Sequence, residues 1–230
     1  QIIMAIATDG AAGNVLSSKA LKETRRKETL NGLKKLGIPI FLDLPDGQLS
    51  FTSNAQSIIN EFVKETNPNL IITHSSKDYH PDHRALCKLV TEAAGFKSPI
   101  IFSDTLMGVN FLPDIYVDIT PYFIDKKDAI LCHKSQRPQK FVTAVKIWNS
   151  FRAAQCNAPE DFYAESYRIN KTFPFSDIRS ILPETVQLRP FYSKESDGLI
   201  WKDYSLGVNF LPPLVGSIIP VVVGKVIGKL

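Results

Sequence analysis

Apolar and polar positions follow two alternating patterns along roughly the first half of the chain. Short continuous apolar runs end at polar or turn residues, which is typical of strands buried on both faces of a parallel sheet. Between these runs, apolar positions recur at helical spacing among charged residues, and Gly37 and Gly95 stand where glycine commonly ends a helix. The patterns predict strands over residues 2–8, 38–44, 69–74 and 99–104, and helices over residues 18–36, 54–64 and 84–95.

This alternation predicts βαβ units, and therefore an α/β protein with a Rossmann-like, mainly parallel sheet flanked by helices and a less regular C-terminal part. A chain of 230 residues can bury one substantial core. We expect a single α/β domain over residues 1–230, in which residues 171–230 form a C-terminal extension whose role the pattern does not define. In the less regular part, the pattern predicts strands over 114–120 and 161–169 and a largely helical stretch over 124–156.

Composition and charge exclude several classes of protein. The hydrophobic fraction of 44% and the charged fraction of 22% are ordinary for a globular protein. The formal net charge is +4, but Lys and Arg are scattered, and the one dense stretch, KETRRKE (22–28), is diluted by two glutamates, so we expect no nucleic-acid partner. Three cysteines without CxxC spacing predict neither a disulfide framework nor a cysteine zinc site. These unpaired cysteines favour a reducing compartment, and no basic leader precedes the first apolar run. We therefore expect a cytoplasmic location.

The tail over residues 206–230 is apolar, but three prolines and two lysines interrupt it. A membrane-spanning helix needs about 20 consecutive apolar residues, which this tail does not supply. We expect a packed strand or core segment there. Contact with a membrane surface or a partner is the alternative.

The stretch THSSKDYHPDHRAL, Thr73 to Leu86, follows a predicted buried strand and leads into a helix. His80, Asp82 and His83 are therefore expected at the carboxyl end of a parallel strand, where open α/β sheets bind ligands. Neutral imidazole is a common zinc ligand, and a second histidine can stabilise an oxyanion or pass a proton while Asp82 fixes its tautomer. The alternative is that the two histidines only cap a helix or pack on the surface. So many polar residues after a buried strand favour a metal site, since they are costly unless exposed, paired or metal-bound.

Several short segments, taken in order, resemble the zinc-dependent de-N-acetylases of the PIG-L/LmbE family. The resemblance spans most of residues 1–170 and implies a hydrolase that uses zinc to remove an acetyl group from an N-acetylated sugar or glycoconjugate. The segments are IATDG (6–10), RRKE (25–28), LGIPIFLDLPDGQL (36–49), THSSKDYHPDHRAL (73–86), FLPDIYVDIT (111–120), LCHKSQ (131–136) and YAESYRI (163–169).

The resemblance implies roles for five residues that stand at the positions of the family's active-site residues. His83 is similar to the zinc-binding histidine, His80 to the residue that stabilises the oxyanion or donates a proton, and Asp82 to its orienting partner. Arg25 stands where the family has a substrate-binding arginine, and Asp46 where an acidic residue contacts the sugar. The alternatives are a solvated helix face for Arg25 and a simple turn residue for Asp46.

Three other polar residues are expected to be structural. Asp9 matches the family pattern, but we expect it to shape the loop after the first strand. His74 and His133 are expected to be satisfied structural histidines.

The family also has a PHPDD-like motif after its first strand, which supplies two further zinc ligands and a general base. No second HPD occurs in this sequence. One interpretation is a deacetylase whose PHPDD motif lies upstream, and another is a noncatalytic carbohydrate-binding or scaffold relative. A third is a different metal hydrolase that uses Asp9 or Asp104 as substitute ligands. The particular sugar and the oligomeric state, including a homo-oligomer, stay open.

Overall fold

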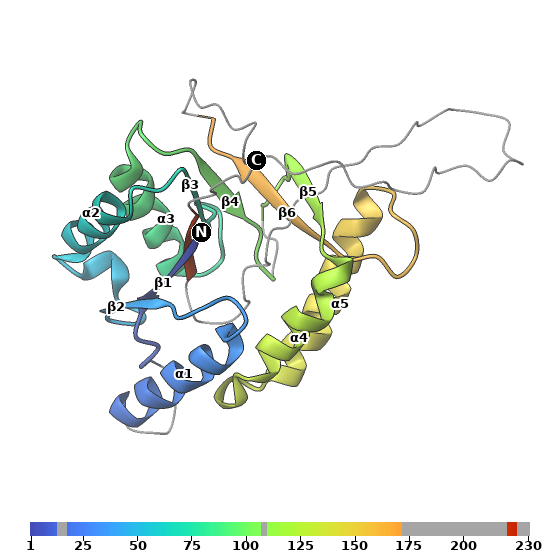
Figure 1. Cartoon of the computed structure of the whole chain (residues 1–230), viewed down its shortest axis with the longest axis horizontal. Coiled ribbons are helices and arrows are strands. Elements are labelled where there is room, and N and C mark those ends of the chain that lie inside the picture. The colour runs from blue at the N-terminus through green and yellow to red at the C-terminus, as the bar shows by residue number, and fades with distance from the viewer. Residues whose placement is uncertain (13–17, 107–109, 172–219, 225–230) are drawn as a thin grey trace, which may run out of the picture.

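The computed structural model describes residues 1–12, 18–106, 110–171 and 220–224. These residues form a seven-stranded sheet with helices on both faces (Figure 1). The order of strands across the sheet is β2-β1-β7-β3-β4-β6-β5. The strands are β1 (Ile2–Thr8), β2 (Ile40–Leu44), β3 (Leu70–His74), β4 (Ile100–Ser103), β5 (Ile115–Asp118), β6 (Ala164–Ile169) and β7 (Pro220–Gly224). The α-helices are α1 (Ser18–Leu33), α2 (Ala55–Thr66), α3 (Pro81–Ala94), α4 (Phe123–Leu131) and α5 (Pro138–Gln155).

Pairing directions in the sheet confirm the predicted α/β class. Strands β1 and β2 pair in parallel, as do β3 and β4. Strand β7 lies between β1 and β3 and is antiparallel to both, and β6 is antiparallel to β4 and to β5. Strands β1 to β5 therefore all run in one direction, and only β6 and β7 oppose them. The sheet is mainly parallel in this sense, as the alternation of strands and helices predicts.

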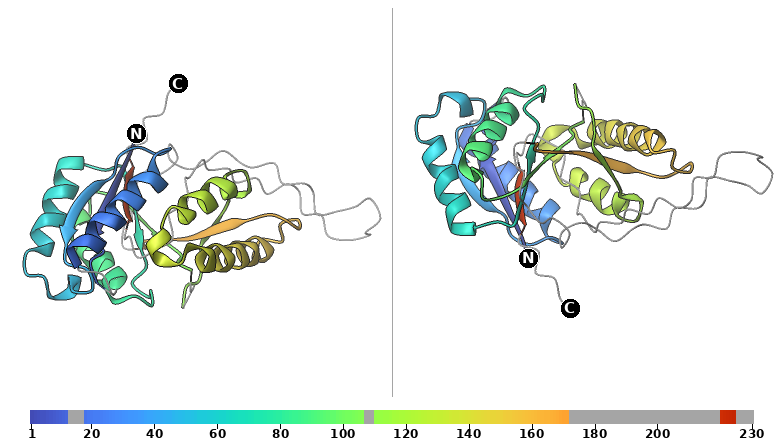
Figure 2. Two further views of the ribbon diagram at one scale, coloured as in Figure 1. Left: turned by 90° about the horizontal axis from the view of Figure 1, so that it is seen from below. Right: turned by 90° about the horizontal axis from the view of Figure 1, so that it is seen from above.

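The two faces of the sheet separate two layers of helices. Successive side chains of a strand point to opposite faces, so Ala5 and Ala7 of β1 pack in the core under α2 and α3, whereas Met4 and Ile6 pack against Leu33 of α1. Figure 2 shows this part of the sheet between the α2–α3 pair and α1. Burial on both faces explains why the first strand is a continuous apolar run.

Two buried ion pairs fix α4 and α5 against the second half of the sheet. Arg152 of α5 contacts Asp104, which follows β4, with an Nη2–Oδ2 distance of 2.6 Å. Lys126 of α4 pairs with Glu165 of β6. All four side chains are at most 6% exposed, and such pairs stabilise a fold only where their geometry is well satisfied.

Differences from the sequence prediction lie at element ends. Helix α1 ends at Leu33, because the amides of Leu36 and Gly37 both return to the carbonyl oxygen of Leu33 in a turn. The helical stretch over 124–156 is two helices, and Arg137 in the left-handed region (φ 54°) separates them just before Pro138.

The apolar tail is described only in part. Its residues 220–224 form β7, in agreement with the expected strand, and the rest of residues 206–230 lies outside the described residues, as does most of the predicted extension over 171–230. Among the described helices, none combines the length and apolar character needed to cross a bilayer.

Candidate metal centre

The loop between β3 and α3 is folded by short local hydrogen bonds. Strand β3 ends at His74, and the Oδ1 atom of Asp78 accepts the backbone N–H of His80 at 2.8 Å. His80 caps α3: its Nδ1 atom accepts the backbone N–H of Asp82 at 3.2 Å, and Pro81 takes the first helical position, where its missing N–H costs nothing. These bonds place the polar side chains of the loop over the carboxyl end of β3.

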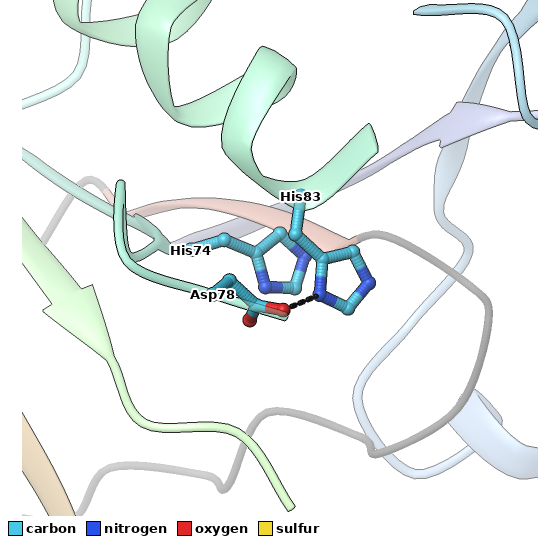
Figure 3. A group of neighbouring side chains, drawn as sticks. All are labelled: His74, Asp78 and His83. Carbon is cyan, nitrogen blue, oxygen red and sulfur yellow. Dashed lines mark ion pairs between the residues drawn. The ribbon is translucent and has the colours of Figure 1, made fainter. Parts of the chain in front are cut away.

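His74, Asp78 and His83 come together as a buried cluster (Figure 3). One ligand atom from each lies within 4.8 Å of the others. The Nδ1 atom of His83 is 3.0 Å from Oδ1 of Asp78, without the geometry of a hydrogen bond. The strand end supplies His74, the loop supplies Asp78 and the first turn of α3 supplies His83.

The polar atoms of this cluster fit a metal ion. Both ring nitrogens of His74, both of His83 and the Oδ2 atom of Asp78 are buried and have no hydrogen-bond partner among the described residues. Buried polar groups without partners are costly and rare in folded proteins. Two imidazoles and a carboxylate match the ligands of catalytic zinc.

The protonation states of the cluster also suit metal binding. Burial, reinforced by the neighbouring His83, holds the pKa of His74 well below its usual value. Burial alone would raise the pKa of Asp78, but the adjacent His83 and the backbone N–H of His80 outweigh it and lower that pKa. The cluster therefore presents a neutral imidazole and an ionised carboxylate near neutral pH, which are the forms that bind metal.

His80 lies beside the cluster and is partly exposed. Its ring centroid is 4.6 Å from that of His83, and the planes are inclined by 30°. Burial and the nearby His83 lower the pKa of His80, although Asp82 and Asp46 oppose this effect. Because Nδ1 accepts a hydrogen bond, we assign the proton of the neutral ring to Nε2.

Asp82 is 1% exposed and makes different contacts from those that the resemblance implies. Its carboxylate accepts the backbone N–H groups of Gly47 at 2.6 Å and Leu49 at 3.2 Å, in the loop after β2. The hydrogen bond to His80 comes from its backbone N–H. The structure thus places Asp82 next to His80, with its charge directed at the neighbouring loop.

Arg25 and Asp46 pair with one another at the edge of the site. Arg25 is 6% exposed, so the alternative of a solvated helix face is wrong. Its Nη1 atom donates to the carbonyl oxygen of Gly10 and to Oδ2 of Asp46, the latter at 3.3 Å. Asp46 also accepts the backbone N–H of Ala12 at 3.1 Å, and burial raises its pKa. Whether either residue binds substrate stays a prediction.

Asp9 and His133, which were expected to be structural, and Asp104, the alternative substitute ligand, have different outcomes. Asp9 shapes its loop as predicted, because its Oδ1 atom accepts the backbone N–H groups of Ala11 and Asp46. His133 is buried, in line with a structural role. Asp104 accepts hydrogen bonds from Trp148, Arg152 and Ser166, and therefore lies outside the cluster.

Sequence reasoning missed His74 and Asp78 as partners of His83. His74 was expected to be structural, and Asp78 received no role. The available signal was positional: His74 is the last residue of a buried strand, and Asp78 stands two residues before His80 in the same loop. Side chains at such a strand end converge with those of the following helix N-terminus.

Fold and site together define an α/β protein with a candidate metal centre at the carboxyl end of a central strand. The sequence model of the PIG-L family, described as GlcNAc-PI de-N-acetylase, matches residues 1–94, which include the whole cluster. This match confirms the resemblance to the PIG-L family predicted from the sequence. A comparison with curated proteins finds no match.

Solved structures share the fold at low sequence identity. An N,N'-diacetylchitobiose deacetylase from Pyrococcus horikoshii is 22% identical with a TM-score of 0.61, covering 76% of each chain. GalB, the 4-carboxy-2-hydroxymuconate hydratase from Pseudomonas putida, is also 22% identical with a TM-score of 0.57, covering 72% of this chain and 78% of GalB. A deacetylase involved in teicoplanin biosynthesis, solved as a triple mutant, is 20% identical with a TM-score of 0.54, covering 73% of this chain and 85% of that one. At these identities the likeness establishes the fold alone.

Proposed function

We propose that the protein is a zinc-dependent hydrolase that removes the acetyl group from an N-acetylated amino sugar or glycoconjugate. The observation that carries this proposal is the buried cluster of His74, Asp78 and His83, whose ring nitrogens and one carboxylate oxygen lack hydrogen-bond partners among the described residues. The match of residues 1–94 to the de-N-acetylase family supports the substrate class. The fold shared with a diacetylchitobiose deacetylase is consistent with it.

In this proposal His74, Asp78 and His83 hold the zinc ion. Three protein ligands leave a coordination position for water or substrate, as in other catalytic zinc sites. When bound, zinc supplies a Lewis acid that polarises a carbonyl oxygen and lowers the pKa of a coordinated water. Burial of the three ligands keeps bulk water from competing for them.

His80 donates a hydrogen bond from Nε2 to the oxygen of the acetyl group. Its Nδ1 atom already accepts the backbone N–H of Asp82, and its lowered pKa keeps the ring neutral near neutral pH. The Nε2–H group is therefore the available donor. A donor fixed in this way stabilises the negative charge that develops on the oxygen as the amide carbon becomes tetrahedral. Asp82 keeps His80 in place through its backbone N–H.

Two other functions are tested beside deacetylation. The fold is shared with GalB, the 4-carboxy-2-hydroxymuconate hydratase, so a hydratase is the second enzymatic candidate. A noncatalytic relative would bind an N-acetylated sugar without turnover. Fold likeness cannot choose between these functions, because one fold hosts many chemistries.

The test is acetate release by the purified, zinc-loaded protein from N-acetylglucosaminyl phosphatidylinositol and from diacetylchitobiose. A deacetylase releases one acetate for each free amine formed, and the His83→Ala variant loses both zinc and activity. Binding of either compound without acetate release would instead indicate the noncatalytic relative. Hydration of a conjugated enol acid without acetate release would indicate the hydratase.

A further inference from the structure

The loop between β2 and α2 is attached to the rest of the site at two places. On one side, the backbone N–H of Asp46 donates to Asp9 at 3.3 Å, and the Asp46 carboxylate accepts from Ala12 and Arg25. On the other side, the Gly47 and Leu49 amides donate to Asp82. The second attachment joins this loop to α3 and hence to His80, beside the apolar packing of Leu49 in the core that α3 also lines.

Asp82 is suited to this attachment by its place in the helix. It follows Pro81 in the first turn of α3, where a negative charge is favourable because the free N–H groups of the helix point toward it. At 1% exposure its carboxylate is desolvated, and the two N–H donors of the loop offset that cost. Both carboxylate oxygens are used, one by each donor. An asparagine in this place could accept only one of the two bonds, because its NH₂ group would face the second N–H.

The same residue also fixes His80. The backbone N–H of Asp82 donates to Nδ1 of His80. One residue therefore holds the His80 ring through its main chain and the loop that carries Asp46 through its side chain.

We propose that Asp82 is a positioning residue whose carboxylate holds the loop 46–49 against α3, and thereby sets where Asp46 stands relative to His80. Its effect on catalysis rests on the proposed function, whereas its effect on the loop does not. An orienting partner of His80 would act on the chemical step. An anchor of the loop acts on substrate binding, because the histidine remains capped by the main chain when the carboxylate is removed.

Amide hydrogen exchange measured residue by residue tests the attachment directly. In the unmodified protein the Gly47 and Leu49 amides should be protected, although Gly47 lies in a turn outside the helices. In Asp82→Asn the amide that loses its acceptor should exchange at least about tenfold faster, as expected for the loss of a hydrogen bond to a charged acceptor. Asp118→Asn is the matched control, since Asp118 accepts the backbone N–H of Thr120 at 2.8 Å at another helical turn.

Three outcomes are distinguishable. Unprotected Gly47 and Leu49 amides in the unmodified protein would overturn the proposal, whether or not Asp82→Asn folds. Exchange in Asp82→Asn that matches the control variant would overturn it as well. If the protein deacetylates sugars, Asp82→Asn should raise KM about tenfold or more with a smaller change in kcat, and a loss confined to kcat would instead assign Asp82 to the orientation of His80.

Discussion

The imidazole rings of His74 and His83 lie parallel, with 3.8 Å between their centroids and 5° between their planes. One ring comes from the last residue of β3 and the other from the first turn of α3. Two buried imidazoles this close would repel each other if both were protonated, and burial together with His83 keeps the pKa of His74 well below its usual value. The arrangement is favourable when both rings are neutral and a cation lies within reach of their nitrogens.

Replacing His74 should therefore weaken metal binding as much as replacing His83. We expect His74→Asn and His83→Asn each to lower zinc affinity by more than about tenfold, because each removes one of three ligands. His133→Asn is the control, since His133 is a buried histidine outside the cluster. Zinc retained per chain after buffer exchange measures the effect. Full retention by His74→Asn would show that His74 is only a core residue.

Replacing His80 should separate metal binding from turnover. His80 is not among the three clustered ligands, so His80→Ala should keep its zinc. Loss of the Nε2–H donor should reduce deacetylation by about a hundredfold or more, as for other oxyanion donors. Zinc content and kcat measured on the same preparation check both parts. Near-normal turnover in His80→Ala would remove His80 from the proposed chemistry.

The fold could be predicted well because its signal is repeated along the chain. Buried strands such as Ile2–Thr8 and Leu70–His74 need apolar residues on both faces, so each leaves a continuous apolar run in the sequence. The apolar spacing does not determine where an element ends, since the end of α1 depends on a turn at Leu33.

Of the residues at the candidate site, the sequence singles out only those that local spacing marks. His80, Asp82 and His83 lie within one helical turn, and their spacing signals a helix N-terminus directly. His74 and Asp78 join His83 only because the loop after β3 folds back through the hydrogen bond from His80 to Asp78. The contact of Asp82 with Gly47 and Leu49 links residues more than thirty positions apart, and no spacing rule in a single sequence reports such a contact.

Gly10 should be intolerant of a side chain for a reason that Gly47 does not share. Both residues have positive φ, 67° for Gly10 and 77° for Gly47, so alanine at either position incurs the left-handed backbone cost of about 1–2 kcal/mol. A Cβ atom on Gly10 would also lie 2.8 Å from Cδ of Arg25, whereas one on Gly47 meets only Ala12 Cβ at 3.6 Å.

We therefore expect Gly10→Ala to lower the free energy of unfolding by about 1–3 kcal/mol more than Gly47→Ala, because Arg25 is buried and paired with Asp46 and has little room to move. Equilibrium unfolding in denaturant compares the two variants. Equal losses would mean that Arg25 moves aside at no cost.

Asp104 should matter for stability and not for zinc. Its Oδ2 atom accepts hydrogen bonds from Trp148 Nε1 at 2.9 Å, Arg152 Nε at 2.7 Å and Ser166 Oγ at 2.9 Å, so it joins β4, β6 and α5. Asp104→Asn leaves the buried guanidinium of Arg152 without its counter-charge, and breaking a buried ion pair in this way costs about 3–5 kcal/mol. Asp114→Asn is the control, because the Asp114 carboxylate makes an exposed hydrogen bond to the backbone N–H of Ile169. Denaturant unfolding should show a large loss for Asp104→Asn and a small one for the control, with zinc content unchanged in the folded protein. Loss of zinc from folded Asp104→Asn would instead favour Asp104 as a substitute ligand and would count against His74 and Asp78.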